Sequence, residues 1–478
     1  MRRRLRWLLL PLSFAAAAGA QTEPNLDAFG LIVAVQSRPS FAIVGAGARP
    51  AGMAGAFTAV ADDASAASFN PAGLALLLTP EASLVIDQFE REDSFGAFVD
   101  LENGIPETYG PSASSFDATG LNFLSFTYPL TAAGRNLSLQ LSFHRAIDFT
   151  FESDRVFDES AAGVPAASLQ QSVRQTGDVD TLTVAAAYQL TPRTSLGLTV
   201  SRWTGDWTFT TSTRETEIDG DGESFLSYSQ TNDWEGWNVS LGALLRYRYL
   251  NVGATARLPF DGDFSVSSTL TTNFETPFEP TSHSDATLEW PGSWTLGLAL
   301  KPLETWFITV DYAEYDWDDA LLVGLADQPL NFFDLKPEDE STTRNTGQWR
   351  YGTEYTFFAG KHLLAVRGGW FDLPRPQLLS PGDEKSSRRG FALGFGWKAG
   401  NVALDVAYQR STSSALELQF VDPETVGSGI VSAQAVGKVE TTDERLFLSA
   451  LYRFPSRSAL NDLFHFLFVG GKDAGKGG

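Results

Sequence analysis

The sequence predicts an all-β membrane protein, a 14-stranded antiparallel transmembrane β-barrel. Apolar side chains alternate with small or polar ones over about nine to twelve residues, and short and long connections between these segments alternate along the chain. A soluble β-sandwich also alternates, but its strands average about five or six residues. The segments have the length that a tilted strand needs to cross a bilayer, which favours the barrel.

Residues 1–20 are typical of a secretory signal peptide. Four arginines precede an apolar run from Trp7 to Ala18, and small residues lead to Ala20, after which we expect cleavage. No later stretch reaches the roughly 18 to 20 apolar residues that a membrane-spanning helix requires. We therefore expect a protein that works outside the cytoplasm and does not cross a membrane with helices.

The composition excludes several classes of function. The chain has no cysteine, which excludes a disulfide scaffold, thiol catalysis and cysteine-ligated zinc. Its net charge of -23 repels phosphate backbones, so we expect no nucleic-acid partner. The four histidines, at positions 144, 283, 362 and 465, form no nucleophile and base pattern. We predict no enzyme activity, no catalytic residue, no metal site and no cofactor.

The alternation locates the strands. In residues 401–410, for example, Val402, Leu404, Val406 and Tyr408 share one face, opposite small or polar residues. Such segments give fourteen expected strands, and Trp and Tyr near their ends suit an aromatic girdle. The expected strands are 82–89, 120–130, 136–147, 180–190, 194–203, 236–247, 250–258, 293–301, 305–315, 348–358, 361–371, 389–398, 401–411 and 443–454.

The connections predict the orientation. Six are tight and seven are long, and an even number of strands that starts and ends on the short side places both termini in the periplasm. The long connections hold most of the acids. The run Asp219 to Glu223 could bind calcium through clustered carboxylates, but it lacks the spacing of an EF-hand loop, which favours a solvated turn.

Residues 21–80 do not alternate and do not fit the barrel, which is expected at 81–454. They are rich in Ala and Gly, which suits short, closely packed helices. Asn70 followed by Pro71 has the form of a helix N-cap with Pro at the first helical position. Asp62 and Asp63 suit a helix start by the same reasoning.

The stretch from Gly45 to Leu74, with Ala61-Asp62-Asp63-Ala64 and Asn70-Pro71-Ala72-Gly73 within it, resembles the hatch of the long-chain fatty acid transporter family, also called the outer membrane protein P1 and toluene transporter family. The segment from Trp294 to Trp317 and the hairpin around Gly394 and Asp405 are similar to it as well. Pro50 and Met53 depart from its usual small-residue run. The resemblance implies that residues 21–80 form a small helical N-terminal hatch, or plug, in the lumen of the barrel. It also implies hatch and gating roles for Asp62, Asp63, Asn70, Pro71, Ala72 and Gly73.

The resemblance also implies a function, a ligand-gated passive diffusion channel in the outer membrane for long-chain fatty acids or other hydrophobic compounds. In the family, ligand first meets a groove between the third and fourth outer loops, moves to an inner pocket and leaves laterally through a kinked strand. Expected partners are that ligand and the outer-membrane lipid and lipopolysaccharide, with the protein as a monomer. The alternative is a barrel that serves as a docking platform for secreted partners, through its acidic loops and the tail 455–478, whose apolar residues have helical spacing.

Two sets of residues are candidates for ligand binding. Aromatic residues of the third and fourth long connections either line the apolar groove or belong to strands that extend beyond the membrane and pack together there. These are Trp203, Trp207, Phe209, Phe225, Trp234, Phe260 and Phe264. The charged residues expected to face inward are Arg246, Asp311, Arg367, Asp405 and Arg453. Arg246 and Arg367 either bind a carboxylate head group, or the inward charges pair with one another across the lumen and hold the plug.

Overall fold

The computed structural model describes residues 45–96, 98–102, 105–109, 111–161, 164–217, 223–272, 281–376, 387–420 and 435–455. The predicted signal peptide, residues 21–44 of the predicted hatch, Asp219 and Asp221 of the acidic run, and all of the predicted C-terminal tail except its first residue lie outside the described residues.

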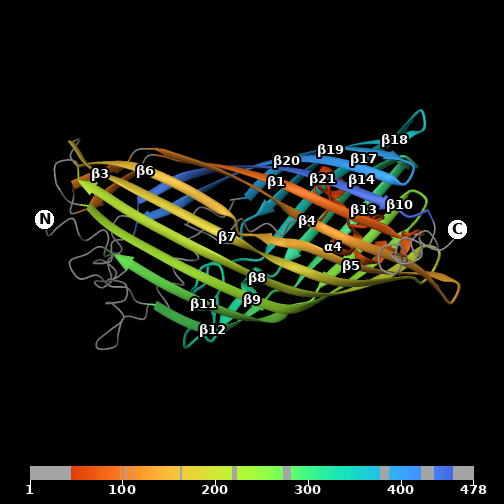
Figure 1. The fold of residues 1–478 in the computed structure, drawn as a ribbon, viewed down its shortest axis with the longest axis horizontal. Helices are drawn as coiled ribbons and strands as arrows, with labels where there is room; N and C mark the ends of the chain where they lie inside the picture. The colour runs from red at the N-terminus through yellow and green to blue at the C-terminus, as the bar shows by residue number, and fades with distance from the viewer. Residues whose placement is uncertain are drawn as a thin grey trace, which may run out of the picture.

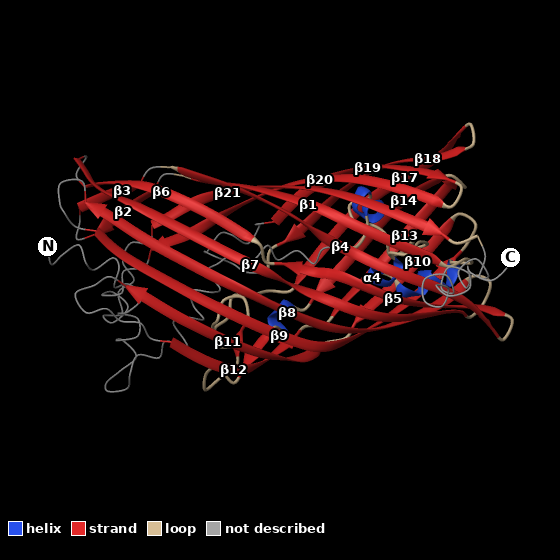
Figure 2. Cartoon of the chain, viewed as in Figure 1, coloured by secondary structure: helices blue, strands red, loops and turns tan. Residues whose placement is uncertain are grey.

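The strands close into the predicted 14-stranded antiparallel barrel (Figure 1). Each strand pairs with the next, and the last returns to the first, where Glu81 lies opposite Arg453. The tilted strands form the long wall that Figure 2 shows in red. In order, the strands are β1 (Glu81–Phe95), β4 (Ser112–Ala132), β5 (Arg135–Asp148), β7 (Val164–Gln189), β8 (Thr194–Glu217), β9 (Glu223–Arg246), β10 (Leu250–Arg257), β13 (Ser293–Leu303), β14 (Trp306–Tyr315), β17 (Thr346–Ala359), β18 (His362–Pro374), β19 (Ser387–Ala399), β20 (Val402–Phe420) and β21 (Ala435–Arg453).

Several strands are much longer than the sequence predicts. The β8–β9 ladder continues from Thr194 opposite Leu245 to Thr216 opposite Glu223, through a region expected to be a loop. The apolar alternation stops there because the wall no longer contacts lipid, while polar pairs such as Thr208 and Thr231 continue the ladder. Further strands extend the same end: β2 (Phe98–Glu102), β3 (Ile105–Tyr109), β6 (Phe151–Ala161), β11 (Phe260–Thr272), β12 (Thr281–Trp290), β15 (Leu321–Val323) and β16 (Leu330–Asn331).

The outer face of the barrel carries an apolar belt. On β8, Leu196 and Leu198 are 47% and 42% exposed, whereas the alternate residue Thr199 is buried on the lumen side. A row of aromatic rings also faces outward, as a membrane girdle requires. Its neighbouring ring centroids lie 4.8 to 6.2 Å apart, in the order Trp294, Tyr312, Trp349, Tyr351 and Trp370.

Residues 45–80 lie inside the barrel as three short helices, α3 (Ala48–Gly52), α4 (Ala66–Phe69) and the 3₁₀-helix η2 (Pro71–Leu76) (Figure 2). We call these residues the N-terminal segment. Glycines on the lumen side of the wall allow its backbone to approach closely, since an added Cβ would lie within 3 Å of an atom of the segment. These glycines are Gly197, Gly242, Gly253, Gly297, Gly352, Gly369 and Gly394.

Among the described residues, no helix is both long enough and apolar enough to cross a membrane.

Candidate functional site

A cavity of about 220 Å³ lies between the N-terminal segment and the wall. The segment contributes Ala54, Thr58 and Phe69 to its lining. The wall contributes mainly serine and threonine hydroxyls from the lumen faces of β5, β7, β8, β9, β10 and β13. These hydroxyls line the lumen because they occupy the inward positions of the alternating strands. The cavity therefore has many hydroxyl groups in its lining, unlike the apolar belt on the outer face.

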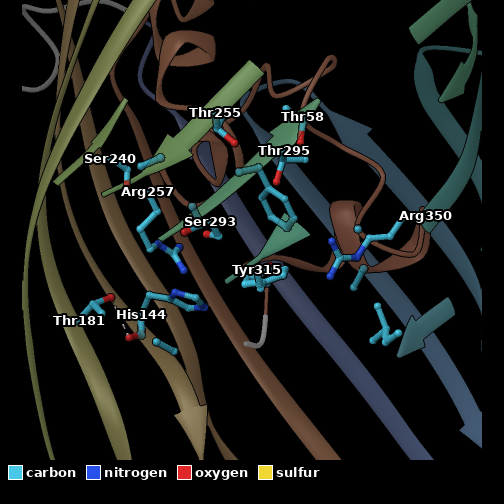
Figure 3. A pocket seen from close by; sticks show the side chains of 18 of the residues that line it. Thr58, His144, Thr181, Ser240, Thr255, Arg257, Ser293, Thr295, Tyr315 and Arg350 are labelled. Carbon is cyan, nitrogen blue, oxygen red and sulfur yellow. Dashed lines mark hydrogen bonds between the residues drawn. The ribbon is translucent and has the colours of Figure 1, made fainter. Parts of the chain in front are cut away.

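Arginines give the cavity a positive lining. Four of them, Arg257, Arg350, Arg388 and Arg445, line it together with a single acid, Asp443. In Figure 3 the side chains of Arg257, Arg350 and Tyr315 extend into the cavity. Arg388 contacts Asp443 at 3.2 Å. A polar chamber with an excess of cations therefore lies inside a strongly acidic chain.

A buried aromatic cluster adjoins the cavity at Trp203, which belongs to both. Trp207 stacks on Phe149 with ring centroids 4.3 Å apart, and Trp234 lies 5.1 Å from Trp290. The predicted ligand-binding residues Trp203, Trp207, Trp234, Phe260 and Phe264 all belong to this cluster. They lie on β8, β9 and β11, on strands that extend the barrel, and they pack together there.

The other two predicted aromatic residues lie elsewhere. Phe209 is buried on β8 outside this cluster. Phe225 lies near the start of β9, where the Arg214 guanidinium lies 5.9 Å from its ring centroid.

The cluster is completed by residues that sequence reasoning did not select. The connection from Asp316 to Asn345 contributes Trp317 and Phe333, and it contains η3 (Trp317–Asp319), β15 and β16. Asn331 holds this connection in shape: its amide donates to the carbonyl of Trp317 at 3.2 Å and accepts from the Phe333 N–H at 2.9 Å. Trp317 between Asp316 and Asp318-Asp319 was the available signal, but the acids favoured a solvated loop.

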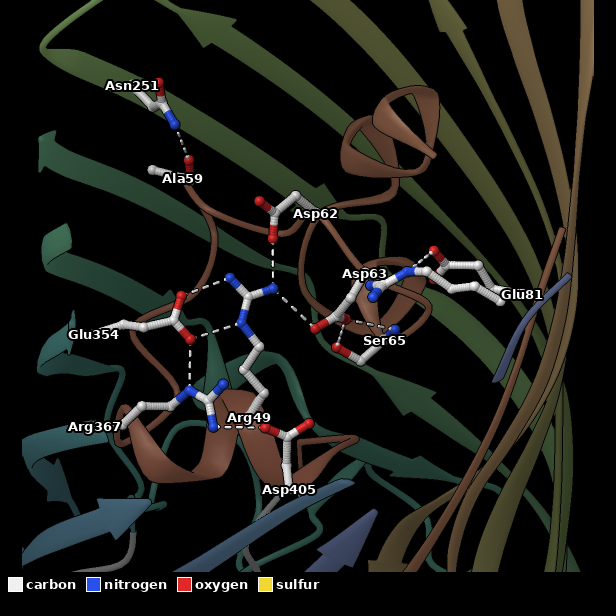
Figure 4. Close-up of polar contacts among 11 residues, drawn as sticks. Arg49, Ala59, Asp62, Asp63, Ser65, Glu81, Asn251, Glu354, Arg367 and Asp405 are labelled. Atoms are coloured by element: carbon white, nitrogen blue, oxygen red, sulfur yellow. Dashed lines mark hydrogen bonds and ion pairs between the residues drawn. The ribbon is translucent and has the colours of Figure 1, made fainter. Parts of the chain in front are cut away.

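An ion-pair network anchors the N-terminal segment to the wall (Figure 4). Arg49 donates two hydrogen bonds of 2.8 Å to Glu354 on β17 and also pairs with Asp62 and Asp63 within the segment. Burial alone lowers the pKa of Arg49, but the charges of Asp62, Glu354 and Asp63 raise that pKa well above its usual range. Arg49 therefore stays charged and holds three carboxylates.

Arg367, a predicted ligand-binding residue, belongs to the same network. Its guanidinium contacts Glu354 at 2.5 Å and Asp405 at 2.7 Å. It does not line the cavity. The second predicted arginine, Arg246, ends β9 at the opposite end of the barrel from the aromatic cluster, beside the turn at 247–249, and does not line the cavity either.

Asn70 joins the segment to the barrel. Its side chain caps η2 by accepting from the Ala72 N–H at 3.1 Å, with Pro71 at the first helical position, as the sequence predicts. Its amide also donates to the carbonyls of Thr58 and Ala243, at 2.9 and 3.0 Å. Gly73 packs so tightly that an added Cβ would lie 1.7 Å from the Ala61 carbonyl oxygen. The predicted hatch residues Pro71, Ala72 and Gly73 are all buried in this contact.

The wall ladder is interrupted between β4 and β5. Within the described residues, pairing of these strands ends at Phe123 opposite His144, although both strands continue beyond this point. Contact resumes where the hydroxyls of Ser114 and Ser153 lie 3.0 Å apart. We call residues 115–122 and 145–152 the ladder interruption.

Side chains fill the ladder interruption. The rings of Phe116 and Phe151 meet edge to face at 5.6 Å. Arg145 reaches over Gly120 and pairs with Asp178 at 2.9 Å. The cavity reaches this place through Ala146, and the N-terminal segment reaches it through the Gly47 N–H, which donates to Asn122.

No group of three or more acidic or histidine side chains in the described part of the chain is arranged to hold a metal ion.

Comparisons with known proteins agree with this architecture. The sequence profile described as outer membrane protein transport protein (OMPP1/FadL/TodX) matches residues 31–435. A Pseudomonas aeruginosa FadL homologue has a similar structure, with a TM-score of 0.61 at 14% identity over 85% of this chain and 98% of that one. The Pseudomonas putida toluene transporter TodX gives 0.56 at 15% identity over 86% and 99%.

The Ralstonia pickettii toluene transporter TbuX gives a TM-score of 0.52 at 15% identity, over 87% of this chain and all of that one. A search of curated protein sequences found no match. At these identities the structural likeness establishes the fold.

Proposed function

The chain belongs to the outer membrane protein transport family (OMPP1/FadL/TodX), and we propose that it carries hydrophobic compounds, long-chain fatty acids among them, passively inward across the outer membrane. The observation that carries the proposal is that three features of the lumen adjoin one another. The aromatic cluster meets the cavity at Trp203, and both the cluster and the cavity reach the ladder interruption at Ala146. Each feature suits one step of transport.

Capture is assigned to the aromatic cluster. Its rings offer apolar surface at the extended end of the barrel, and the connection 316–345 covers them. A ligand can take the place of the connection 316–345 against these rings. Its hydrocarbon then stays out of water, and this burial is the main source of affinity for hydrophobic compounds. Trp203 then passes the ligand to the cavity.

Release is assigned to the ladder interruption. The N-terminal segment fills the lumen on the other side of the cavity, where its small residues pack against the glycines of the wall. A hydrophobic ligand gains nothing from continuing into water on that side, whereas a lateral path between β4 and β5 leads to lipid. Because Gly47 binds Asn122 at this place, movement of the segment and opening of the interruption are coupled. The kinked strand that the family resemblance implies is then β5, whose pairing with β7 shifts between Arg145 and Ile147.

The proposal includes an orientation and an assembly state. The extended end faces the outside and its lipopolysaccharide, and the end with tight turns faces the periplasm, where we propose that both termini lie. We also propose a monomer, because a single barrel contains the aromatic cluster, the cavity and the ladder interruption.

Uptake by cells tests the proposal. The chain is expressed in Gram-negative cells that lack a transporter of this family, and uptake of radiolabelled oleate and of toluene is measured separately. Saturable uptake of at least one compound, absent from cells with an empty vector, is expected. If correctly assembled, heat-modifiable barrel gives neither uptake nor saturable binding of either compound, transport is wrong and the docking alternative is favoured.

A further inference from the structure

We propose that the aromatic cluster recognises a carbonyl oxygen through the indole N–H groups of Trp203 and Trp234. Neutral compounds that join a hydrocarbon to a ketone or ester group are then among those that the barrel captures. The inference names a ligand class for the capture step, and it therefore rests on the proposed transport. It distinguishes the cluster from a purely apolar surface, which would bind hydrocarbons by size and shape alone.

Two buried donors of the cluster have no acceptor. Trp203 and Trp234 are 2% and 3% exposed, and neither indole nitrogen has a hydrogen-bond partner among the described residues. A buried indole N–H usually finds an acceptor, and a buried donor without one destabilises the fold. Phenylalanine would fill most of the same space without this cost. Packing alone therefore does not explain the two N–H groups, whereas an acceptor from outside the chain does.

Other tryptophans of the chain do find acceptors. Trp317, in the same cluster, donates to the Thr346 hydroxyl at 3.0 Å. Trp306, at the start of β14, donates to the Thr353 hydroxyl at 2.9 Å. Both hydroxyls belong to β17. The fold thus satisfies indole donors on one wall with threonine and leaves two donors in the aromatic cluster without a partner.

The surroundings of Trp234 favour an uncharged acceptor. Phe260 stacks on its ring with centroids 5.8 Å apart, and its indole nitrogen packs over Gly262, where an added Cβ would lie 2.2 Å from it. Arg257 lies against the Trp203 ring, but no basic side chain in the described part of the chain does so at Trp234. A carboxylate here would lose its hydration without gaining a cation. A carbonyl oxygen loses less and still accepts the N–H.

The place of the donors gives a ligand access to them. Trp203 also lines the cavity, and the connection 316–345 covers the cluster through Trp317, whose ring lies 5.8 Å from that of Trp290. A compound that takes the place of this connection meets the rings and the N–H groups together. Its hydrocarbon part replaces the ring contacts, and its carbonyl oxygen accepts from an indole. A hydrocarbon of the same shape makes only the first of these contacts.

Acetophenone and isopropylbenzene test the inference on the unmodified protein, because they have the same number of non-hydrogen atoms and nearly the same shape but differ in the carbonyl group. The detergent-purified barrel, with isotope-labelled indole nitrogens, is titrated with each compound and followed by NMR. We expect acetophenone to move the indole N–H resonances of Trp203 and Trp234 downfield, as hydrogen bonding does. Isopropylbenzene should not. Each resonance is assigned by its absence from the variant that lacks that tryptophan.

Two substitutions and a matched control measure the contribution of the donors. Trp203→Phe and Trp234→Phe should each weaken acetophenone binding about threefold to tenfold, the range for one neutral hydrogen bond, and leave isopropylbenzene binding nearly unchanged. Trp317→Phe removes an indole of the same cluster whose N–H already has an acceptor in Thr346. It should change the two affinities by the same factor. Heat-modifiability of each variant shows that the barrel is folded.

The outcomes separate this inference from the transport proposal. Equal losses of the two compounds in Trp203→Phe and Trp234→Phe, indole resonances that respond alike to both, or binding of isopropylbenzene alone would overturn the inference. Transport would still stand if oleate or toluene bound saturably. If neither test compound, oleate nor toluene bound to the folded barrel, the transport proposal itself would be wrong.

Discussion

Asn70 is completely buried and makes three hydrogen bonds, two within the N-terminal segment, to Thr58 and Ala72, and one to the Ala243 carbonyl of the barrel wall. Asn70→Ala would leave two carbonyls and the Ala72 N–H without partners, each at a cost of about 1–3 kcal/mol. We expect η2 to open more readily, so that hydrogen exchange of residues 70–76 becomes at least about tenfold faster. Exchange followed by mass spectrometry measures this directly.

Asn331→Ala is the matched control. Asn331 is also completely buried and also holds a local turn, but it lies in the connection 316–345. The Asn331→Ala variant should accelerate hydrogen exchange in the connection 316–345 and leave the exchange of residues 70–76 unchanged. Equal exchange of η2 in both variants and in the unmodified protein would mean that Asn70 does not anchor the segment.

Glu354 is the acid that two arginines share, one on the segment and one on the wall. Glu354→Gln would leave Arg49 and Arg367 facing each other with one carboxylate fewer, a loss of about 3–5 kcal/mol for a buried pair. We expect the segment to loosen and ion conductance through the barrel in planar bilayers to rise. Glu440→Gln breaks the exposed pair with Lys438 and should leave conductance unchanged. A Glu354→Gln conductance equal to that of the unmodified protein would exclude this anchoring role.

Single residues also show what the sequence reveals and what it does not. Asn70 was predictable as a cap because capping depends on its immediate neighbours. Inward orientation of Arg367 was predictable from alternation, but its partners Glu354 and Asp405 come from other strands. Arg257 was not selected, because only the assembled barrel shows that it lines the cavity between the N-terminal segment and the wall.

Among the elements, adjacent glycines on β18 offer a direct test of how closely the segment packs on the wall. A Cβ at Gly369 would lie 2.6 Å from the Met53 carbonyl carbon, whereas at Gly368 the nearest atom is 3.9 Å away. Gly369→Val should therefore displace the segment, at an overpacking cost of about 1–3 kcal/mol. Because the chain has no cysteine, maleimide labelling of a single Ala67→Cys reporter measures the displacement, with faster labelling expected.

Gly368→Val introduces the same side chain one position away and should label as the reporter alone does. Faster labelling in both variants would point to a general effect on β18 and against local packing of the segment.

The strands were predictable in their membrane-crossing parts and not beyond them. Lipid contact imposes the apolar alternation, so the pattern ends with the membrane while the hydrogen-bonded ladder continues. The rule of strict alternation fails at Pro259. Arg257 and Phe260, three positions apart, both contribute to the lumen, because Pro259 has no N–H to continue the ladder. Next to Pro259, the Leu258 N–H donates to the Val239 carbonyl of the neighbouring strand β9.

For the whole molecule, the decisive question is whether ligand leaves through the ladder interruption. Ser114 and Ser153 border it, and their hydroxyls lie 3.0 Å apart, so Ser114→Cys with Ser153→Cys places two thiols within reach of a disulfide. The chain has no other cysteine to compete. Oxidation should tie β4 to β6 and reduce oleate uptake by cells, and a reductant should restore it.

Ser268→Cys with Ser282→Cys distinguishes a blocked exit from a stiffened barrel. Their hydroxyls lie 2.7 Å apart across the β11–β12 ladder, which is paired without interruption from Phe260 to Thr269. Its disulfide adds the same kind of cross-link where no exit is proposed, so uptake should be unaffected by oxidation. Loss of uptake in both would indicate that the extended wall must move as a unit. If neither cross-link reduced uptake, the ligand would have to leave past the N-terminal segment, and the glycine and Glu354 variants would then control its rate.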